Sequence, residues 1–430
     1  MKILLMKIIA LILIFETLYS CSKGGGGSGN DSVVSLNSFY SLDDLSSVAT
    51  KSGKVPLYTT SGSENGLISM GDISSCVVMS SGKVKCWGFN AVFQLGSNKA
   101  GFINQKTPVL ADILLENAVS ISAGYLQTCA YLSSGMKCWG DQNDGVLGNQ
   151  VNSATPAQTP QVVKNLGGQQ IKMMAIGDSH VCVLFSGTQS VSCWGQNSQM
   201  QLAQSSTSTP SSLTAVPINL PEPIKSIATS DFNPCAVAVS GNLYCWGQFI
   251  STPANPNPVL IASNVKNISS GEQSHFCYTD TNANIYCFGT NDKLQLGSST
   301  APAGFNKTPL QVSGISHATA IVAGKVHTCA ITNDGASVVC WGDNSVGQLG
   351  ASSNNPNKSA IPIAVVGLPA ANVIDIAAAD NNTCALLDND DVYCWGNNTI
   401  PPAGGTSDFL GVASPTVSYT AVKVLNRNDL

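Results

Sequence analysis

The sequence predicts an all-β protein, a seven-bladed β-propeller of four-stranded blades with one disulfide in each blade. Fourteen of its fifteen cysteines form seven pairs, and the second cysteine of each pair begins a "CWG" triplet or, in one copy, "CFG". Successive first cysteines lie 53, 53, 53, 42, 52 and 55 residues apart, which indicates one supersecondary unit repeated seven times. The pairs are Cys76 with Cys86, Cys129 with Cys138, Cys182 with Cys193, Cys235 with Cys245, Cys277 with Cys287, Cys329 with Cys340, and Cys384 with Cys394.

Each copy contains signals for about four short strands. In the last copy, an alternating run at residues 373–376 is followed by a polar break, by residues 383–387, by an Asp/Asn turn and by residues 392–395. Two short runs of branched and aromatic residues around a turn predict a hairpin. A proline-led run, such as "TPVL" at Thr107, adds a further strand. Four-stranded sheets in this number favour a propeller. An open β-solenoid is the alternative, although its rungs are usually shorter.

Proline-led runs also flank the repeats at both ends. "KVPLY" begins at Lys54, before the first CWG unit, and "SPTV" begins at Ser414, after the last one. Seven units are thus bracketed by eight such runs. We expect strands from both termini to meet in one blade and close the ring. The alternative is an N-terminal overhang that pairs with no strand.

The N-terminus is organised like a bacterial lipoprotein signal peptide. Residues 1–7 are basic, residues 8–15 are apolar, and Leu18-Tyr19-Ser20-Cys21 resembles a lipobox with Cys21 as the lipid acceptor. The apolar run is too short to cross a bilayer as a helix. Tyr19 is larger than the residue preferred at its position, so a plain secretory signal is the alternative.

These features divide the chain into three parts. Residues 1–20 are the predicted signal peptide, residues 21–54 the lipidated cysteine and its tether, and residues 55–430 the propeller. The tether begins with the Gly/Ser-rich stretch "SKGGGGSGND", which is typical of a flexible linker. By resemblance to bacterial sorting rules, Ser22 favours the outer membrane. We therefore expect a cell-envelope protein held to the membrane by its lipid alone.

The cysteine framework predicts an oxidising compartment, because an even and regular set of cysteines is typical of disulfides. Eight to ten residues separate the two cysteines of each pair across a turn, which suits a bond between adjacent strands of one blade. Zinc is the competing interpretation, but it requires closely spaced ligands, such as two cysteines two residues apart. The sequence contains no such pair. We expect structural disulfides and no metal.

Charge argues against a nucleic-acid partner. The chain has 20 basic and 25 acidic residues, a net charge of −5, and only 10% charged residues, far below the usual quarter. It has no Lys/Arg cluster, on which phosphate binding depends. A Gly-rich phosphate loop, a nucleophile elbow and an HExxH motif are also absent from the sequence. We expect a monomeric protein that is not an enzyme and needs no cofactor.

A polar residue stands two positions before the first cysteine of every blade. Because this position recurs, the seven side chains should form a ring near one end of the central channel. The functional interpretation is a ring of ligands for a metal or small molecule. The favoured interpretation is a structural hydrogen bond at the start of the strand. The ring contains Ser74, Gln127, His180, Asn233, His275, His327 and Asn382.

Long polar loops connect most CWG triplets to the next proline-led strand. Repeat symmetry places these loops on one face, and insertions on one face of a repeat array often mark the binding side. Some loops carry apolar residues that a solvated loop does not require, which suits a protein partner. The alternative is that these residues fold back onto their own blades. The candidate binding residues are Phe93, Phe102, Met200, Leu294, Phe305 and Phe409.

The segment "AGKVHTCAITNDGASVVCWGDNSVGQLG", residues 323–350, resembles a repeat of the regulator of chromosome condensation family of seven-bladed propellers. The resemblance extends over residues 55–425. Blade four departs from it, because its repeat is 42 residues long and lacks the "GQLG" segment. Blade seven replaces that segment with "NNTIPPAGG". The resemblance implies the fold, but not the nuclear member's nucleotide-exchange activity, since no exchange-specific insertion is recognisable.

The sequence therefore predicts a lipid-anchored, non-enzymatic interaction or adhesion module that binds a protein or glycan through its loops. A similar propeller, a secreted β-lactamase inhibitor, implies by resemblance that such a ring can bind an enzyme. The alternative is an envelope enzyme, or a receptor for a small ligand or metal, at the channel mouth around His180, His275 and His327.

Overall fold

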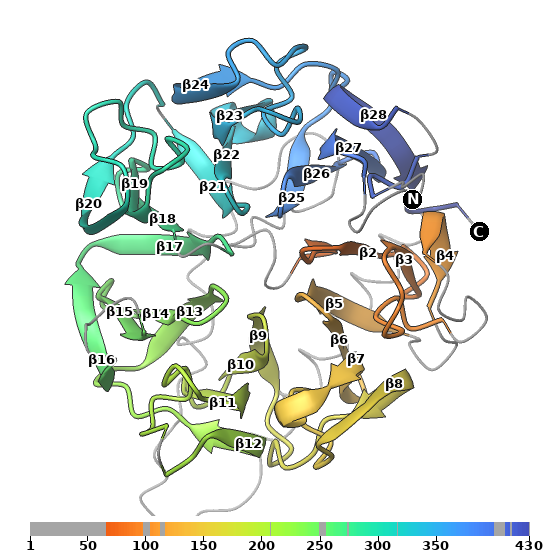
Figure 1. The fold of residues 1–430 in the computed structure, drawn as a ribbon, viewed down its shortest axis with the longest axis vertical. Coiled ribbons are helices and arrows are strands. Elements are labelled where there is room, and N and C mark those ends of the chain that lie inside the picture. Colours follow the sequence, from red (N-terminus) through yellow and green to blue (C-terminus); the bar gives the residue numbers. More distant parts are fainter. Residues whose placement is uncertain are drawn as a thin grey trace, which may run out of the picture. The chain divides into compact units, whose positions relative to one another are not determined.

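The chain divides into two units, residues 1–53 and residues 54–430. The computed structural model describes a large part of the second unit, namely residues 66–97, 104–111, 117–206, 208–248, 255–272, 275–315, 317–399, 409–412 and 415–429. Its 28 described strands form seven four-stranded antiparallel sheets around a central axis (Figure 1). The predicted seven-bladed propeller is confirmed.

Every blade consists of four strands that follow one another in the chain. Blade one contains β1 (Ile68–Met70), β2 (Ser74–Val78), β3 (Val84–Gly88) and β4 (Gln105–Leu110). Blade two contains β5 (Ala118–Ala123), β6 (Gln127–Leu132), β7 (Gly135–Gln142) and β8 (Ser153–Val162). Blade three contains β9 (Ile171–Ile176), β10 (His180–Phe185), β11 (Val191–Gln196) and β12 (Ser211–Pro217). Blade four contains β13 (Ile224–Thr229), β14 (Pro234–Ala238), β15 (Leu243–Gly247) and β16 (Asn255–Ala262).

The other three blades repeat this arrangement. Blade five contains β17 (Val265–Ser270), β18 (His275–Asp280), β19 (Ile285–Thr290) and β20 (Phe305–Gln311). Blade six contains β21 (Ala318–Ala323), β22 (His327–Thr332), β23 (Ser337–Asp343) and β24 (Lys358–Ala364). Blade seven contains β25 (Val373–Ala379), β26 (Asn382–Leu387), β27 (Asp391–Asn397) and β28 (Val417–Asn426). Two short 3₁₀ turns, η3 (Asn143–Gly145) and η4 (Asn333–Gly335), follow β7 and β22.

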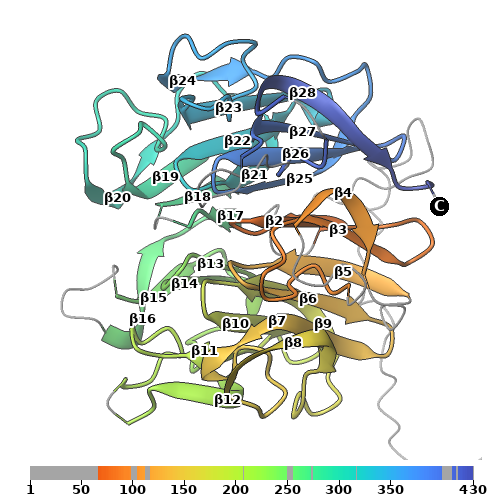
Figure 2. The ribbon, with the colours of Figure 1, turned by 45° about the vertical axis from the view of Figure 1, so that its right-hand side comes forward.

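The first strand of each blade lies at the centre and the fourth lies at the rim (Figures 1 and 2). β1 contacts both β5 and β25, so the inner strands form a closed ring. The inner strand β25 is buried along its whole length, whereas the rim strand β24 is partly exposed. The prolines of the six runs between "TPVL" at Thr107 and "IPIAVV" at Ile361 lie in rim strands, where an unpaired outer edge tolerates a residue without an N–H group.

Each cysteine pair joins the second and third strands of one blade. In every blade the two cysteines are direct cross-strand partners. Their Cα atoms lie 4.0–4.1 Å apart, close to the narrower antiparallel spacing of about 4.5 Å. The prediction of one intrablade disulfide per blade is confirmed. The seven disulfides join Cys76 to Cys86, Cys129 to Cys138, Cys182 to Cys193, Cys235 to Cys245, Cys277 to Cys287, Cys329 to Cys340, and Cys384 to Cys394.

The glycine of each CWG or CFG triplet has a backbone conformation that favours glycine. Its φ lies between 96° and 111° in all seven blades. In blade one, a Cβ atom on Gly88 would lie 2.7 Å from the carbonyl oxygen of Ile73. The third strand of each blade ends at this glycine or within two residues after it, so the triplet marks the disulfide and lies just before the long loop.

The hydrophobic core lies between blades. One cluster joins Val78 and Leu95 of blade one to Ile121 and Trp139 of blade two. Another joins Ile68 and Trp87 of blade one to residues of blade seven. All six tryptophans are fully buried. Each blade is therefore stabilised mainly by its neighbours, as in other repeat proteins.

The C-terminal segment closes the ring by hydrogen bonds to blade one. Arg427 Nε donates to the carbonyl oxygen of Val78 at 2.6 Å, and Arg427 Nη1 lies 3.0 Å from Asp390 Oδ1 of blade seven. The Ser80 backbone N–H donates to the Arg427 carbonyl at 3.0 Å. We call this arrangement of Arg427, Asp390, Val78 and Ser80 the C-terminal clasp. The "KVPLY" run lies outside the described residues, so its expected strand stays a prediction.

Cys21, the predicted signal peptide and the tether also lie outside the described residues. In the described part of the propeller, no helix has the length and apolar character needed to cross a membrane.

Candidate functional site

Two sets of loops share one face of the propeller. The first set connects the first and second strands of each blade, and the second set follows the CWG triplets. They are joined by hydrogen bonds, for example from the Gln196 N–H to the Ser179 carbonyl at 2.8 Å and from the Asp343 N–H to the Val326 carbonyl at 2.9 Å. We call this side of the molecule the loop face.

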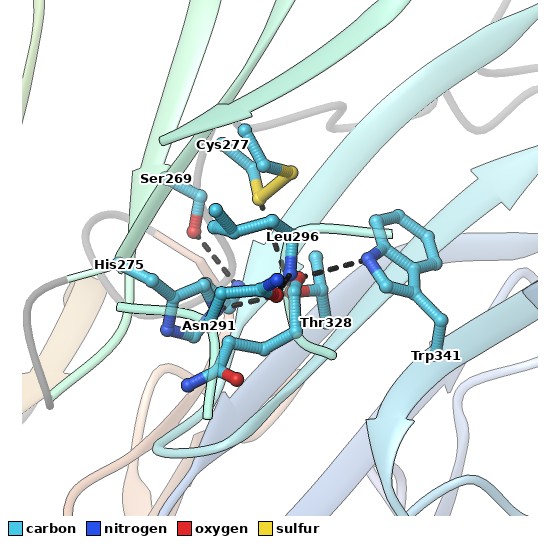
Figure 3. Close-up of a disulfide and its surroundings, with 10 residues drawn as sticks. Ser269, His275, Cys277, Asn291, Leu296, Thr328 and Trp341 are labelled. Carbon is cyan, nitrogen blue, oxygen red and sulfur yellow. Dashed lines mark hydrogen bonds between the residues drawn. A yellow bond between two sulfur atoms is a disulfide. The ribbon is translucent and has the colours of Figure 1, made fainter. Parts of the chain in front are cut away.

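An asparagine holds the start of each described long loop in blades one, three, five, six and seven. Its Oδ1 accepts the backbone N–H of a buried leucine, as in the 3.1 Å bond from Leu296 to Asn291 (Figure 3). The corresponding distances in the other four blades are 2.7–3.3 Å. The base of each of these loops is therefore fixed by two anchors, the asparagine side chain and the buried leucine. The asparagines are Asn90, Asn197, Asn291, Asn344 and Asn398.

Each tryptophan ties its own blade to the loop of the preceding blade. Trp341 Nε1 donates to the Gln295 carbonyl at 2.9 Å (Figure 3), and the other five indoles make equivalent bonds of 2.8–3.1 Å. Blade five has Phe288 at this position, stacked on Phe276 with ring centroids 5.1 Å apart. The blade before it is blade four, whose sequence lacks the "GQLG" segment. The indole donor is thus missing where its acceptor segment is missing.

The candidate binding residues occupy two different environments. Phe93 and Phe409 are 5% and 3% exposed, so they are buried and unavailable as surface anchors. The alternative interpretation, in which apolar loop residues pack onto the blades, therefore fits Phe93 and Phe409. Phe409 packs in the hydrophobic cluster that joins blades one and seven. Met200, Leu294 and Phe305 are half-buried at the loop face. Phe102 lies outside the described residues.

Phe93, Met200 and Leu294 share a left-handed backbone conformation, with φ of 64°, 61° and 65°. In blade six the same position is Gly347, with φ of 81°. Left-handed non-glycine residues are uncommon and are often retained for the side chain they present. The two half-buried members, Met200 and Leu294, are the candidates for such a role.

The seven residues of the expected channel ring are buried, and several of them bond to the next blade. All seven of its residues are 0–1% exposed. Gln127 Nε2 donates to the carbonyl oxygens of Gly177 and Asp178 in the next blade, each at 2.9 Å. His180 Nε2 lies 2.7 Å from Thr229 Oγ1, again in the next blade. These side chains position the neighbouring loop. The ring residues are Ser74, Gln127, His180, Asn233, His275, His327 and Asn382.

The hydrogen bonds of His275 define its tautomer (Figure 3). Thr328 donates its hydroxyl hydrogen to the Gln295 carbonyl at 3.0 Å, so its oxygen accepts from His275 Nε2, also at 3.0 Å. Nδ1 is buried, and no described residue donates to it. Burial lowers the pKa of His275 and His180 to about 3 and that of His327 to about 4. Neutral, buried imidazoles of this kind are structural.

A different set of residues surrounds the channel mouth. They belong to the loops between the first and second strands, two or three positions before the buried ring. Five of the seven are acidic and one is basic. A cavity of about 40 Å³ lies among five of them, Asp72, Tyr125, Asp178, Asp231 and Glu272. We call the full set the mouth residues: Asp72, Tyr125, Asp178, Asp231, Glu272, Lys325 and Asp380.

The carboxyl groups of the mouth disfavour one another's ionisation. Burial, followed by the charge of Asp380, raises the pKa of Asp72 to about 7. Burial and the nearby Asp72 and Asp178 raise the pKa of Asp231 to about 8. Burial and Asp72 raise the pKa of Glu272 well above 4.5. Lys325 Nζ lies 3.2 Å from Asp380 Oδ1 and partly compensates this charge.

The mouth residues were missed in the sequence, although the repeat contains the signal for them. Aligning the seven copies on their first cysteines places Asp72, Asp178, Asp231 and Asp380 at one repeat position and Glu272 one residue earlier. Throughout the described blades and loops, no three histidine, cysteine or carboxylate side chains are arranged to hold a metal ion.

The fold and the interblade bonds define a repeat propeller whose blades are linked by loop–tryptophan contacts. Models of the regulator of chromosome condensation (RCC1) repeat match four segments of the chain: residues 138–184, 282–331, 318–348 and 373–399. The chain therefore contains RCC1-like repeats in these segments.

Similar proteins extend over most of the chain. The ultraviolet-B receptor UVR8 of Arabidopsis thaliana is 28% identical over 349 residues, 77% of each chain. The crystal structure of human WBSCR16 superposes with a TM-score of 0.69 at 18% identity, covering 80% of this chain and 94% of that one. Yeast RCC1 (Prp20), crystallised bound to Kap60, superposes with a TM-score of 0.68 at 17% identity, covering 88% and 89%. These two structures support the fold.

Proposed function

We propose that this protein is a lipid-anchored module of the bacterial cell envelope that binds a protein or glycan partner through its loop face and performs no catalysis. The RCC1-like propeller fold is consistent with a protein-interaction module. The anchoring, the compartment and the adhesive role are the proposed parts.

The arrangement of the loop face carries this proposal. Several long loops lie side by side on one rigid ring, and each described loop base is fixed by buried anchors such as the Asn291–Leu296 bond. A preorganised surface loses little conformational entropy when a partner binds. Met200, Leu294 and Phe305 present apolar groups from this surface while remaining half-buried.

Two further observations support the compartment. Seven disulfides are stable in an oxidising environment and rare in the reducing cytosol. The sequence before the propeller contains a lipobox-like segment ending in Cys21 and a Gly/Ser-rich tether. A tether of this composition would let the ring stand away from a membrane surface.

The alternative function, an enzyme or receptor built on His180, His275 and His327, is less well supported. Their imidazoles are fully buried and their Nε2 atoms are bonded to threonines of the adjacent blade at 2.7–3.0 Å.

The proposal is tested by capturing partners from envelope extracts on immobilised residues 31–430 and mapping the contacts by cross-linking. We expect cross-links from the loop face. Met200→Asp and Phe305→Asp should each weaken capture about tenfold or more, as loss of an apolar anchor commonly does. Val239→Asp is the matched control, because Val239 is 52% exposed in the turn on the opposite face. Equal capture by all three variants would contradict a role for the loop face.

A further inference from the structure

The channel mouth contains more acidic side chains than the nearby basic side chains can neutralise. Lys325 is the one basic side chain among the mouth residues, and it is paired with Asp380 at 3.2 Å. Asp72, Asp178, Asp231 and Glu272 share the lining of one small cavity, and no Lys or Arg is among the described residues that line it. Carboxylates this close in a partly buried site cannot all ionise at little cost, because burial and like charge both disfavour the charged form.

Glu272 shows where a proton is required. Its Oε1 accepts the backbone N–H of Asp380. Its Oε2 is enclosed, and no described N–H or O–H group reaches it. Asp72 lines the same small cavity as Glu272, and a side-chain hydrogen bond between the two carboxyl groups is among the influences on the pKa of Asp72. Two ionised carboxylates offer only acceptors to each other, so this contact is a hydrogen bond only if one of the two carboxyl groups is protonated.

We propose that Asp72 and Glu272 share one proton, and that this proton holds the channel mouth together as a pH-sensitive closure. The pair joins blade one to blade five across the channel, and the bond from the Asp380 N–H to Glu272 likewise joins two blades that are not adjacent, blades seven and five. Loss of the proton places two negative charges against each other in the cavity. Asp178, Asp231 and Asp380 add to the repulsion, and Lys325 opposes it; Tyr125 is the remaining mouth residue.

The titration of these groups supports the closure. The pKa of Asp72 is raised to about 7 and that of Glu272 well above its ordinary value, in both cases chiefly by burial. A carboxyl group with a raised folded-state pKa binds its proton more tightly in the folded chain than in the unfolded one. Its stabilising effect is therefore present at acidic pH and is lost as pH rises toward the folded-state pKa.

The test measures unfolding of the disulfide-intact protein by denaturant at several pH values. Between about pH 5 and pH 7, one retained proton makes the unfolding equilibrium constant rise about tenfold per pH unit. Glu272→Gln replaces the shared proton by an amide donor. We therefore expect the pH dependence of the unfolding equilibrium constant to decrease by the amount that one retained proton contributes. Asp72→Asn should have the same effect. Asp334→Asn is the control, because Asp334 is exposed in η4 and already left-handed, a conformation that asparagine tolerates.

Infrared spectroscopy of the folded protein gives a second measurement that does not depend on unfolding. The wild type should show a protonated-carboxyl C=O band near neutral pH that disappears on alkaline titration. Glu272→Gln should lose part of this band, and Asp334→Asn should retain all of it. Identical spectra for the wild type and Glu272→Gln, or equal pH dependence of unfolding, would overturn the shared proton.

Discussion

At the scale of single residues, one hydrogen-bond donor recurs at the junctions between blades. Each tryptophan buries a large indole and also satisfies a loop carbonyl of the preceding blade, as Trp341 does for Gln295. A buried indole N–H without a partner would cost free energy, so acceptor and donor must occur together. Phe288 fits this reasoning, because it replaces tryptophan at the blade whose predecessor lacks the "GQLG" loop segment.

The tryptophan bond predicts the effect of Trp341→Phe. This change removes the indole N–H, leaves the Gln295 carbonyl with Thr328 as its donor, and creates a small cavity. We expect the free energy of unfolding to fall by about 2–3 kcal/mol, from the lost hydrogen bond and the lost packing together. Denaturant unfolding measures it. A change below about 0.5 kcal/mol would show that the bond contributes little.

The buried histidines predict a dependence of stability on acid. The pKa of His180 is lowered to about 3 by burial, so the unfolded chain binds the proton more readily. Neutral His180 makes its full contribution to the free energy of unfolding above about pH 6.5. This contribution is lost, at about 1.4 kcal/mol per pH unit, as the pH falls toward 3.

His180→Gln isolates this contribution. Glutamine occurs naturally at the equivalent position, Gln127, and its amide also bonds to the next blade. Between about pH 6 and pH 4, the variant should lose less stability than the wild type, by about 1.4 kcal/mol per pH unit. Unchanged acid dependence, measured by urea unfolding, would contradict a neutral buried His180.

At the scale of elements, each blade contains one hairpin with a disulfide between its second and third strands. The bond closes a short loop of about ten residues, so its expected effect on the unfolded chain is moderate. The blade also packs against both neighbours, which retain their own disulfides. The loss of one bond should therefore weaken the ring without unfolding it.

Removal of one disulfide tests this independence of blades. Cys329→Ala with Cys340→Ala should lower the free energy of unfolding by about 2–3 kcal/mol and leave a folded ring. Circular dichroism and denaturant unfolding give the two measurements. Peptide mapping should find the six remaining bonds within their blades, and any bond between blades would contradict the assignment.

The C-terminal clasp is the element that joins the last blade to the first. The Arg427 side chain is 11% exposed and bridges Asp390 and the Val78 carbonyl. Arg427→Ala would leave Asp390 nearly buried without this partner, and we expect a loss of about 2–4 kcal/mol. Lys423→Ala is the matched control, because the Lys423 side chain is 50% exposed and solvent screens its ion pair with Asp391, which should therefore contribute little to stability. Similar losses in both variants, measured by thermal unfolding, would show that the clasp adds nothing to closure.

At the scale of the whole molecule, the predicted anchor determines where the propeller resides. Cys21→Ala should abolish labelling of the protein by a palmitate analogue and release it from the membrane fraction. Several acyl chains anchor a protein firmly, whereas one does so only marginally. Labelling that survives the substitution would place the lipid elsewhere. Cys329→Ala with Cys340→Ala is a control, since it removes cysteines but leaves Cys21.

The sequence predicted the propeller and its disulfides because both follow from a regular repeat. The spacing of paired cysteines and the CWG glycine depend only on local strand geometry, and this geometry is repeated in every copy. The complete burial of the ring could not be predicted, because a repeat position alone does not reveal which way a residue such as His180 points at a strand start. The two interpretations of Phe93 and Phe409 stayed open for a related reason, since the burial of a loop residue depends on contacts distant in the sequence. Asp72 and Glu272 are 200 positions apart in the sequence, so their proximity could be recognised only from the closed ring in the structure.

The exception at Phe288 has a mechanical consequence. Six of the seven seams between blades carry an indole bond to a loop, and the seam between blades four and five does not. A closed ring under tension parts first where its segments share the fewest cross-links. If a partner pulls on the loops while the chain is held at the other end, blades four and five would be the first to separate.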